Sequence, residues 1–279
     1  MQKVYYNGRF FERNEPTVPV TDRSLFFGDA VYDMMIGKGD SIHQAYEHIE
    51  RLLSGAAAIR LCHKYSADDI LEIVSLIVKQ SGYSEYSVYV QLSRNSEKRV
   101  HSNLSANSAN LLVWCDPCEI NPTLHPVKLI TEPDVRYELC NIKTVNLLPA
   151  VLASTKAEEA GCDEAIFYRG NTVTECAHSN IAILEGGRLI THPLGKYILP
   201  GITRKHLLIQ AKALGISCIE EPFSLSRMYG ADDIIITSTT KLMRYASHID
   251  GVSVGGRASE ITKALHRSLF NEYAENCHK

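Results

Sequence analysis

The chain has 279 residues and a formal net charge of −3, from 29 Lys and Arg against 32 Asp and Glu. Hydrophobic residues make up 45% of it and charged residues 22%, which is typical of a globular protein. This length indicates one large or two moderate domains, with enough chain to bury a sizeable core. The near-neutral charge argues against a nucleic-acid partner and against a polybasic membrane contact.

Membrane and metal classes are also excluded by the sequence. No apolar run approaches the ~18 residues that a transmembrane helix needs, and the N-terminus lacks the apolar stretch of a signal peptide. The eight cysteines are dispersed, as in proteins whose thiols stay reduced. Cys115 and Cys118 form a lone CxxC without the second pair or histidine cluster of a zinc site. We therefore expect a cytoplasmic protein with no membrane segment and no metal.

The N-terminal third predicts a hairpin followed by two helices. Asn7-Gly8, the pair favoured by a type I′ turn, separates Val4–Tyr6 from Arg9–Phe11. Apolar residues at helical spacing predict amphipathic helices over residues 46–61 and 68–80, the second with Asp68 as its N-cap.

The rest of the chain predicts short strands mixed with helices. Expected strands cover residues 87–92, 109–114, 127–131, 165–168, 181–184, 189–191 and 234–237. Expected helices cover residues 146–160, with Pro149 in the first turn, 202–214 and 260–274. Without a regular βαβ rhythm, this order predicts two α+β domains. We place them at residues 1–116 and 127–279, joined by a linker over 117–126 that is rich in proline breakers.

Four motifs that identify common enzymes are absent: GxxxxGK[ST], GxGxxG, HExxH and GxSxG. Their absence argues against kinases, Rossmann dehydrogenases, zinc hydrolases and serine hydrolases. The eleven histidines show no convincing metal-ligand spacing.

Three weaker features can carry chemistry. Residues 200–204 begin a helix with a glycine and Thr203, where backbone N–H groups can seat a phosphate; an ordinary helix start is the alternative. Residues 237–240 supply hydroxyls after an apolar strand, or simply form a polar strand end. Lys143, among apolar neighbours, is either an amine nucleophile or a lysine that reaches solvent. An amine, a phosphate seat and the acid Glu175 are together what pyridoxal phosphate needs.

Six segments in one order along the chain make this interpretation specific. They are Asp22–Tyr32, His48–Leu52, Asn141–Leu148, Asn171–Glu175 with Ser179-Asn180, Leu199–Arg204 and Thr237–Thr240. Together they resemble the fold-type IV pyridoxal-phosphate enzymes, which include branched-chain aminotransferases, D-amino-acid aminotransferases and aminodeoxychorismate lyases. The resemblance runs from about residue 4 to residue 256. It implies an α+β fold with a small N-terminal α/β domain and a larger C-terminal mixed α/β, barrel-like domain.

The resemblance also implies a role for each matching residue. Lys143 is the catalytic lysine, which binds the cofactor covalently and moves the substrate proton. Glu175 pairs with the ring nitrogen, and Leu199 packs on one face of the ring. The residues implied to hold the phosphate are Arg51, Ile202, Thr203 and Thr239.

The segment from Tyr89 to His101 resembles the corresponding segment of the D-amino-acid aminotransferases. In that subfamily an Arg-x-His pair, matched here by Arg99 and His101, comes from the partner subunit of a homodimer. With a tyrosine that matches Tyr32, it binds the substrate α-carboxylate. Asn95 departs from the glycine of the subfamily, and a solvated basic loop is the alternative interpretation.

The sequence thus predicts a homodimeric D-amino-acid transaminase. It would move the amino group of D-alanine or another D-amino acid to a 2-oxo acid such as 2-oxoglutarate, with ping-pong kinetics. The alternatives are a branched-chain L-amino-acid aminotransferase, an aminodeoxychorismate lyase and a non-enzymatic cofactor-binding protein. His178, beside the predicted ring site, and Lys241, near its mouth, depart from the family pattern and leave the substrate range open.

Overall fold

The computed structural model describes residues 3–15, 17–95, 99–102 and 109–277. The chain divides into two compact units. The first contains the chain up to Glu119 together with Ile142–Asn146 and the C-terminal segment from Ala274. The second contains Ile120–Asn141 and Leu147–Tyr273.

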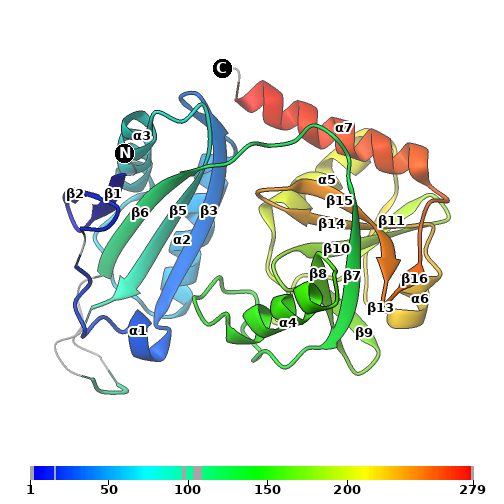
Figure 1. Ribbon diagram of the computed structural model, residues 1–279, viewed down its shortest axis with the longest axis horizontal. Helices are drawn as coiled ribbons and strands as arrows, with labels where there is room; N and C mark the ends of the chain where they lie inside the picture. The colour runs from blue at the N-terminus through cyan, green and yellow to red at the C-terminus, as the bar shows by residue number, and fades with distance from the viewer. Residues whose placement is uncertain (1–2, 16, 96–98, 103–108, 278–279) are drawn as a thin grey trace. The chain divides into compact units, whose positions relative to one another are not determined.

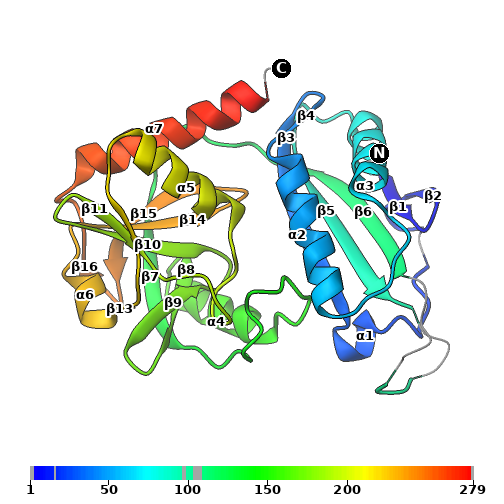
Figure 2. The ribbon, with the colours of Figure 1, turned by 180° about the vertical axis from the view of Figure 1, so that it is seen from behind.

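Among its described residues, the first unit forms an antiparallel six-stranded sheet in the order β2-β1-β6-β5-β3-β4. Its strands are β1 (Lys3–Tyr6), β2 (Arg9–Glu12), β3 (Ala30–Lys38), β4 (Ser41–Ile42), β5 (Glu85–Arg94) and β6 (Ala109–Pro117). Its helices are α1 (Ser24–Phe27), α2 (Ala45–Ala58) and α3 (Ala67–Ser81). Helices α2 and α3 cover one face of this sheet (Figures 1 and 2).

The predicted hairpin is confirmed. Val4 to Tyr6 pair with Phe11 to Arg9, and the turn residues Asn7 and Gly8 have φ angles of 47° and 89°. A type I′ turn needs positive φ at both central positions, which Asn-Gly adopts easily.

The N-cap of helix α3 lies two residues before the predicted one. The N-cap is Ser66, not Asp68, because Ser66 and Asp69 form a reciprocal capping box. The Ser66 hydroxyl accepts the Asp69 backbone N–H (3.1 Å), while the Asp69 carboxylate accepts the Ser66 N–H (2.7 Å). Asp68 instead accepts a hydrogen bond from the Tyr46 hydroxyl. Two orphan donors of the helix start are satisfied by Ser66 and Asp69, which explains the shift.

The second unit, among its described residues, forms a mixed ten-stranded sheet in the order β12-β11-β10-β14-β15-β7-β8-β9-β13, with β16 on β15. Its strands are β7 (Pro126–Pro133), β8 (Glu164–Arg169), β9 (Thr172–Cys176), β10 (Asn180–Glu185), β11 (Arg188–Thr191), β12 (Cys218–Glu220), β13 (Phe223–Ser224), β14 (Asp233–Ser238), β15 (Leu242–Ile249) and β16 (Val252–Ser253). Its helices are α4 (Leu148–Glu159), α5 (Ile202–Ala213), α6 (Leu225–Tyr229) and most of α7 (Ser259–Asn276). The predicted mixture of helices and strands is confirmed, with parallel and antiparallel pairs in one sheet.

Helices pack on different strands of this sheet. Ala150, Ala153 and Ala157 of α4 pack against β8, where small side chains permit close approach. Leu207 of α5 and Leu265 of α7 share a second apolar cluster with residues of β10, β11 and β14. The long sheet is thus covered by apolar helix faces.

Strands β3 and β15 were not predicted. Each interrupts its apolar run with groups that sequence patterns assign to the surface, Asp33 in β3 and Arg244 and His248 in β15. In β3 the Asp33 side chain is buried and paired with Arg51, so a charged residue in this strand does not mean that the strand is exposed. Tertiary pairing, not local pattern, makes these segments strands.

The described residues contain no helix long and apolar enough to cross a membrane. The eight cysteines, all of which lie in the described part of the chain, are free. In the same described ranges no group of three His, Cys, Asp or Glu side chains is placed to hold a metal ion.

Replacing Ser66 with alanine should lower the free energy of unfolding by about 1 kcal/mol, because the first turn of α3 loses its hydroxyl cap. Chemical denaturation followed by circular dichroism measures this. Ser75→Ala, the same change at an exposed position in the middle of α3, is the control and should shift stability by less than about 0.5 kcal/mol. Equal effects of the two changes would contradict a capping role.

Candidate active site

Lys143 lies alongside β3. The Tyr32 N–H donates to the Lys143 carbonyl (2.9 Å), and the Val145 N–H donates to the Ala30 carbonyl (3.2 Å). The half-buried Lys143 side chain places Nζ 4.4 Å from the centroid of the Tyr32 ring. The structure therefore brings together two of the predicted site residues, with the ammonium over an aromatic face.

The Tyr32 ring is at one end of a stack of three aromatic rings on neighbouring strands. It stacks on Tyr89 at 5.3 Å, and Tyr89 stacks on Trp114 at 3.9 Å. Burial raises the pKa of Tyr89, whose hydroxyl donates to the Gln91 side chain (2.8 Å). The stack from β3 through β5 to β6 limits the rotation of the Tyr32 ring.

Arg51 is held by a buried ion pair. Its Nε and Nη2 donate to the two oxygens of Asp33, each at 2.8 Å, and Nδ1 of His48 lies 2.8 Å from Asp33 Oδ1. Burial alone would raise the pKa of Asp33, but Arg51 and His48 hold it well below its usual range. Burial lowers the pKa of His48. The guanidinium of Arg51 is thus fixed on α2 by a residue adjacent to Tyr32.

Arg99 and His101 lie in an exposed loop and contact one ring. The Arg99 guanidinium lies 5.1 Å from the Phe27 ring and 5.7 Å from Phe26, and the His101 ring lies 5.0 Å from Phe27. Residues 96–98 of the predicted segment lie outside the described residues. The structure brings Arg99 and His101 together at Phe27, while Tyr32 stacks on Tyr89.

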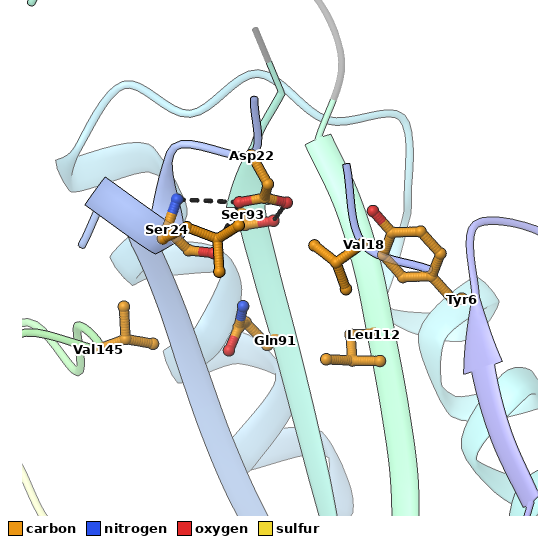
Figure 3. Close-up of a pocket in the computed structure, with 9 residues that line it drawn as sticks. Tyr6, Val18, Asp22, Ser24, Gln91, Ser93, Leu112 and Val145 are labelled. Atoms are coloured by element: carbon orange, nitrogen blue, oxygen red, sulfur yellow. Dashed lines mark hydrogen bonds between the residues drawn. The ribbon is translucent and has the colours of Figure 1, made fainter. Parts of the chain in front are cut away.

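A pocket of about 310 Å³ lies on the first unit near the start of α1 (Figure 3). Its lining includes Asp22, which is 1% exposed and accepts hydrogen bonds from Ser24, Ser93 and Asn110. Burial, with Asp22 nearby, raises the pKa of Tyr6 in the same pocket to about 12. None of the predicted site residues lines this pocket, and Asp22 instead fixes the turn that precedes α1.

In the second unit, Glu175 of β9 is buried and held through both oxygens. Oε1 accepts from Arg136 (2.6 Å), while Oε2 accepts from the Asn180 amide (2.9 Å) and from the Leu199 backbone N–H (3.0 Å). Burial alone would lower the pKa of Arg136, but its bonds to Asp134 and Glu175 raise it. The predicted ring-nitrogen partner and ring-packing residue, Glu175 and Leu199, are therefore joined directly.

The start of α5 has the features of an anion seat. Its N-cap, Gly201, has no side-chain cap, and Ile202 and Thr203 form its buried first turn. A Cβ at Gly201 would lie 1.9 Å from Asn180 Oδ1, so only glycine permits this close approach. Backbone N–H groups and the helix dipole favour a phosphate at such a terminus.

Thr239 follows β14, at the end of that strand which pairs with the beginning of β10. There Thr237 pairs with Asn180 of β10. Asn180 in turn donates to the Leu199 carbonyl (3.0 Å), which links this strand end to the residues before α5. Glu175, Leu199, Ile202 and Thr203 thus lie around Asn180 and the start of α5, and Thr239 follows the strand that pairs with Asn180.

The residues present fit pyridoxal phosphate. In the first unit Lys143 supplies an amine. In the second unit Glu175 supplies a fixed carboxylate, and α5 supplies a helix start where Gly201 lets Asn180 approach closely. His178 adds nothing to this set, because its side chain is 60% exposed and contacts Glu164. The outward-facing interpretation of His178 is the one that the structure favours.

Sequence reasoning did not assign roles to Asp33, Arg136 and Asn180. Asn180 could have been found, since it ends one of the six family segments. A charged residue inside the apolar run 30–36 was a signal for Asp33, because a buried charge needs partners such as His48 and Arg51. Arg136 follows β7 in an irregular segment, and nothing in its local sequence points to Glu175, 39 residues later.

Known proteins match the chain over almost its whole length. The chain is 36% identical over 286 residues to the D-alanine aminotransferase of Listeria innocua, covering 99% of this chain and 97% of that protein. It is 32% identical over 280 residues to the D-alanine aminotransferase of Staphylococcus haemolyticus, covering 99% of each.

Solved structures show the same fold. A branched-chain aminotransferase from Thermoproteus uzoniensis, with norvaline, matches with a TM-score of 0.88 at 24% identity, over 98% of this chain and 96% of that one. A putative 4-amino-4-deoxychorismate lyase from Legionella pneumophila matches with a TM-score of 0.85 at 25% identity, over 93% and 97%. The family model for amino-transferase class IV matches residues 30–249. The chain belongs to the class IV aminotransferases, and it is a pyridoxal-phosphate-dependent enzyme of that family.

Proposed function

We propose that this aminotransferase transfers the amino group of D-alanine, or of another D-amino acid, to a 2-oxo acid such as 2-oxoglutarate. The observation that carries the proposal is the similarity to D-alanine aminotransferases over almost the whole chain. The branched-chain enzyme and the lyase share the fold, which by itself does not select a substrate.

In this proposal each residue of the two groups, one in each unit, has a separate role in cofactor binding or catalysis. Pyridoxal phosphate, when bound, supplies a ring that accepts electrons from the substrate Cα. Lys143 would hold the cofactor covalently until the substrate amine displaces it. The freed Nζ would then move the proton from the substrate Cα to the cofactor in the first half-reaction, and in the opposite direction in the second. Glu175 keeps the ring nitrogen protonated, and Leu199 packs against the ring. The phosphate is bound by Arg51, Ile202, Thr203 and Thr239.

Arg99, His101 and Tyr32 bind the substrate carboxylate. An arginine fork binds a carboxylate through two parallel hydrogen bonds. Both Arg99 and His101 are exposed, and each packs on Phe27. We propose that they act in the active site of the partner subunit of a homodimer, because an exposed cationic pair on one chain is available to another.

We further propose a cytoplasmic enzyme with folding domains over residues 1–116 and 127–279. The segment Cys118–His125, between β6 and β7, contains no helix or strand, which supports a linker over 117–126.

Lys143→Ala should abolish both covalent cofactor attachment and turnover, because no other amine replaces Nζ at this position. Borohydride treatment followed by peptide mapping should place the reduced cofactor on Lys143 of the unaltered protein. Lys156→Ala is the control, since Lys156 is exposed and pairs with Glu132. Reduced cofactor on any other lysine would contradict the assignment.

Glu175→Gln should retain most of the cofactor but lower kcat by about 100-fold or more, because a neutral amide does not hold the ring nitrogen protonated. Cofactor absorbance and steady-state kinetics with D-alanine separate the two effects. Glu132→Gln, a change of the same kind outside the site, should leave kcat unaltered. A Glu175→Gln enzyme with normal turnover would refute the role.

Activity with D-alanine should far exceed activity with L-leucine, because Arg99 and His101 place the carboxylate on the side that suits D-substrates. Arg99→Ala should lower kcat/KM by about ten- to hundredfold, as expected for about 1.5–3 kcal/mol from one charged hydrogen-bonding partner. Cofactor content should not change. Arg188→Ala, at an exposed arginine of β11, is the control.

A panel of D-alanine, L-leucine and aminodeoxychorismate separates the three enzyme classes. Preference for L-leucine would identify a branched-chain enzyme, and release of pyruvate without an amino acceptor would identify a lyase. Mixing the inactive Lys143→Ala chain with the Arg99→Ala chain should restore activity if Arg99 acts across a dimer. No restoration would place Arg99 in the active site of its own chain.

A further inference from the structure

The loop that carries Arg99 and His101 is held through its backbone by Arg23. Arg23 Nη1 donates to the carbonyl of Val100, and Nη2 donates to the carbonyl of His101 at 3.0 Å. One planar guanidinium therefore binds two consecutive carbonyls, which fixes the orientation of both peptide planes.

Arg23 is itself held rigidly. Its side chain is 6% exposed, and its Nε donates to Asp29 Oδ2 at 2.7 Å. The guanidinium lies 4.6 Å from the Phe27 ring, the same ring that Arg99 and His101 contact. The Arg23 side chain is therefore fixed by a carboxylate and by an aromatic ring.

The backbone of Arg23 is anchored as well. Its N–H donates to the Arg94 carbonyl at the end of β5 (3.1 Å). The preceding residue, Asp22, is tied to Ser24 and to Ser93 of β5, as Figure 3 shows. The turn that carries the Arg23 donors is thus anchored to β5 in the sheet of the first unit.

We propose that Arg23 is a positioning residue for substrate carboxylate recognition, aiming Arg99 and His101 by holding the carbonyls of Val100 and His101. The inference rests on the proposed function, in which Arg99 and His101 bind the carboxylate. An exposed loop that is not held would lose conformational freedom on each binding event, whereas a held loop has already lost it. Arg23 therefore improves substrate binding without touching the substrate.

Arg94 provides a matched comparison within the same cluster. It pairs with the same Asp29 oxygen through its Nε (2.9 Å), and its side chain is 11% exposed. Its other nitrogens donate to the carbonyls of Ile59 and Arg60, not to the loop. Both arginines pair with Asp29. Arg23 differs from Arg94 in its hydrogen bonds to the carbonyls of residues 100 and 101.

The test compares holoenzymes with Arg23→Lys and Arg94→Lys. Lysine keeps the charge beside Asp29 but does not reach two carbonyls with a fixed fork. Arg23→Lys should raise KM for D-alanine and for 2-oxoglutarate about tenfold, with kcat changed by less than about twofold. Arg94→Lys should leave both KM values unchanged, while cofactor absorbance stays the same in the two variants.

Hydrogen exchange gives a readout that is independent of activity. The amides of Val100, His101 and Ser102 should exchange faster in Arg23→Lys than in Arg94→Lys, because only Arg23 holds this part of the backbone. Equal exchange in the two variants would overturn the inference.

The double variant separates this inference from the proposed function. In the Arg99→Ala background, Arg23→Lys should add little to the rise in KM, since both changes act on the same recognition element. A full additional rise would show that Arg23 acts elsewhere and would overturn the inference. If Arg99→Ala raises KM but Arg23→Lys does not, the inference fails while the proposed carboxylate site stands. If neither raises KM, the carboxylate site itself is wrong.

Discussion

The buried carboxylate of Asp33 joins strand β3 to helix α2 in the first unit. A charge with no solvent access strongly destabilises a fold unless it is paired and hydrogen-bonded. Arg51 and His48 of α2 meet that requirement, so helix and strand are joined in one register. Because successive side chains of a strand point to opposite faces, the residue before Asp33, Tyr32, points away from α2. Its ring receives Lys143 there.

The second unit also contains a buried carboxylate, that of Glu175, which is held by hydrogen bonds. Its two oxygens are held by donors from three separate segments, namely Arg136, Asn180 and the backbone of Leu199. Asn180 also contacts the glycine that begins α5, so the carboxylate and the helix start are held at a set separation by one side chain. A cofactor that needs an acid at one end and an anion seat at the other requires this kind of rigidity.

Substrate choice in this fold depends on more variable parts. A branched-chain aminotransferase and a putative 4-amino-4-deoxychorismate lyase share the architecture closely, so the sheets and helices do not encode the substrate. The exposed loop with Arg99 and His101 is a part of the chain that can differ between such enzymes. Its attachment to buried Arg23 shows how an exposed loop can still have a defined conformation.

Local sequence determined much of the fold. The hairpin at Asn7-Gly8, the amphipathic helices α2 and α3, and the strands of apolar residues follow from turn chemistry and periodicity, which act over a few neighbouring residues. The order of six segments also identified the family and the candidate residues, from Lys143 to Thr239. The N-cap at Ser66 was within reach of the same reasoning, because Ser66 and Asp69 have the spacing of a capping box.

Tertiary structure decided the rest. The pairing of β3 with β5 and the partners of Asp33 are set by tertiary structure, since the apolar run around Asp33 does not show which distant groups pair with it. Arg136 reaches Glu175 across 39 residues, and Arg23 reaches His101 across 78. Such contacts form only when distant segments pack together. No short stretch of the chain contains both partners, so local sequence does not reveal them. Local sequence therefore determined which residues are candidates for the chemistry, and long-range packing decided which residues hold them in place.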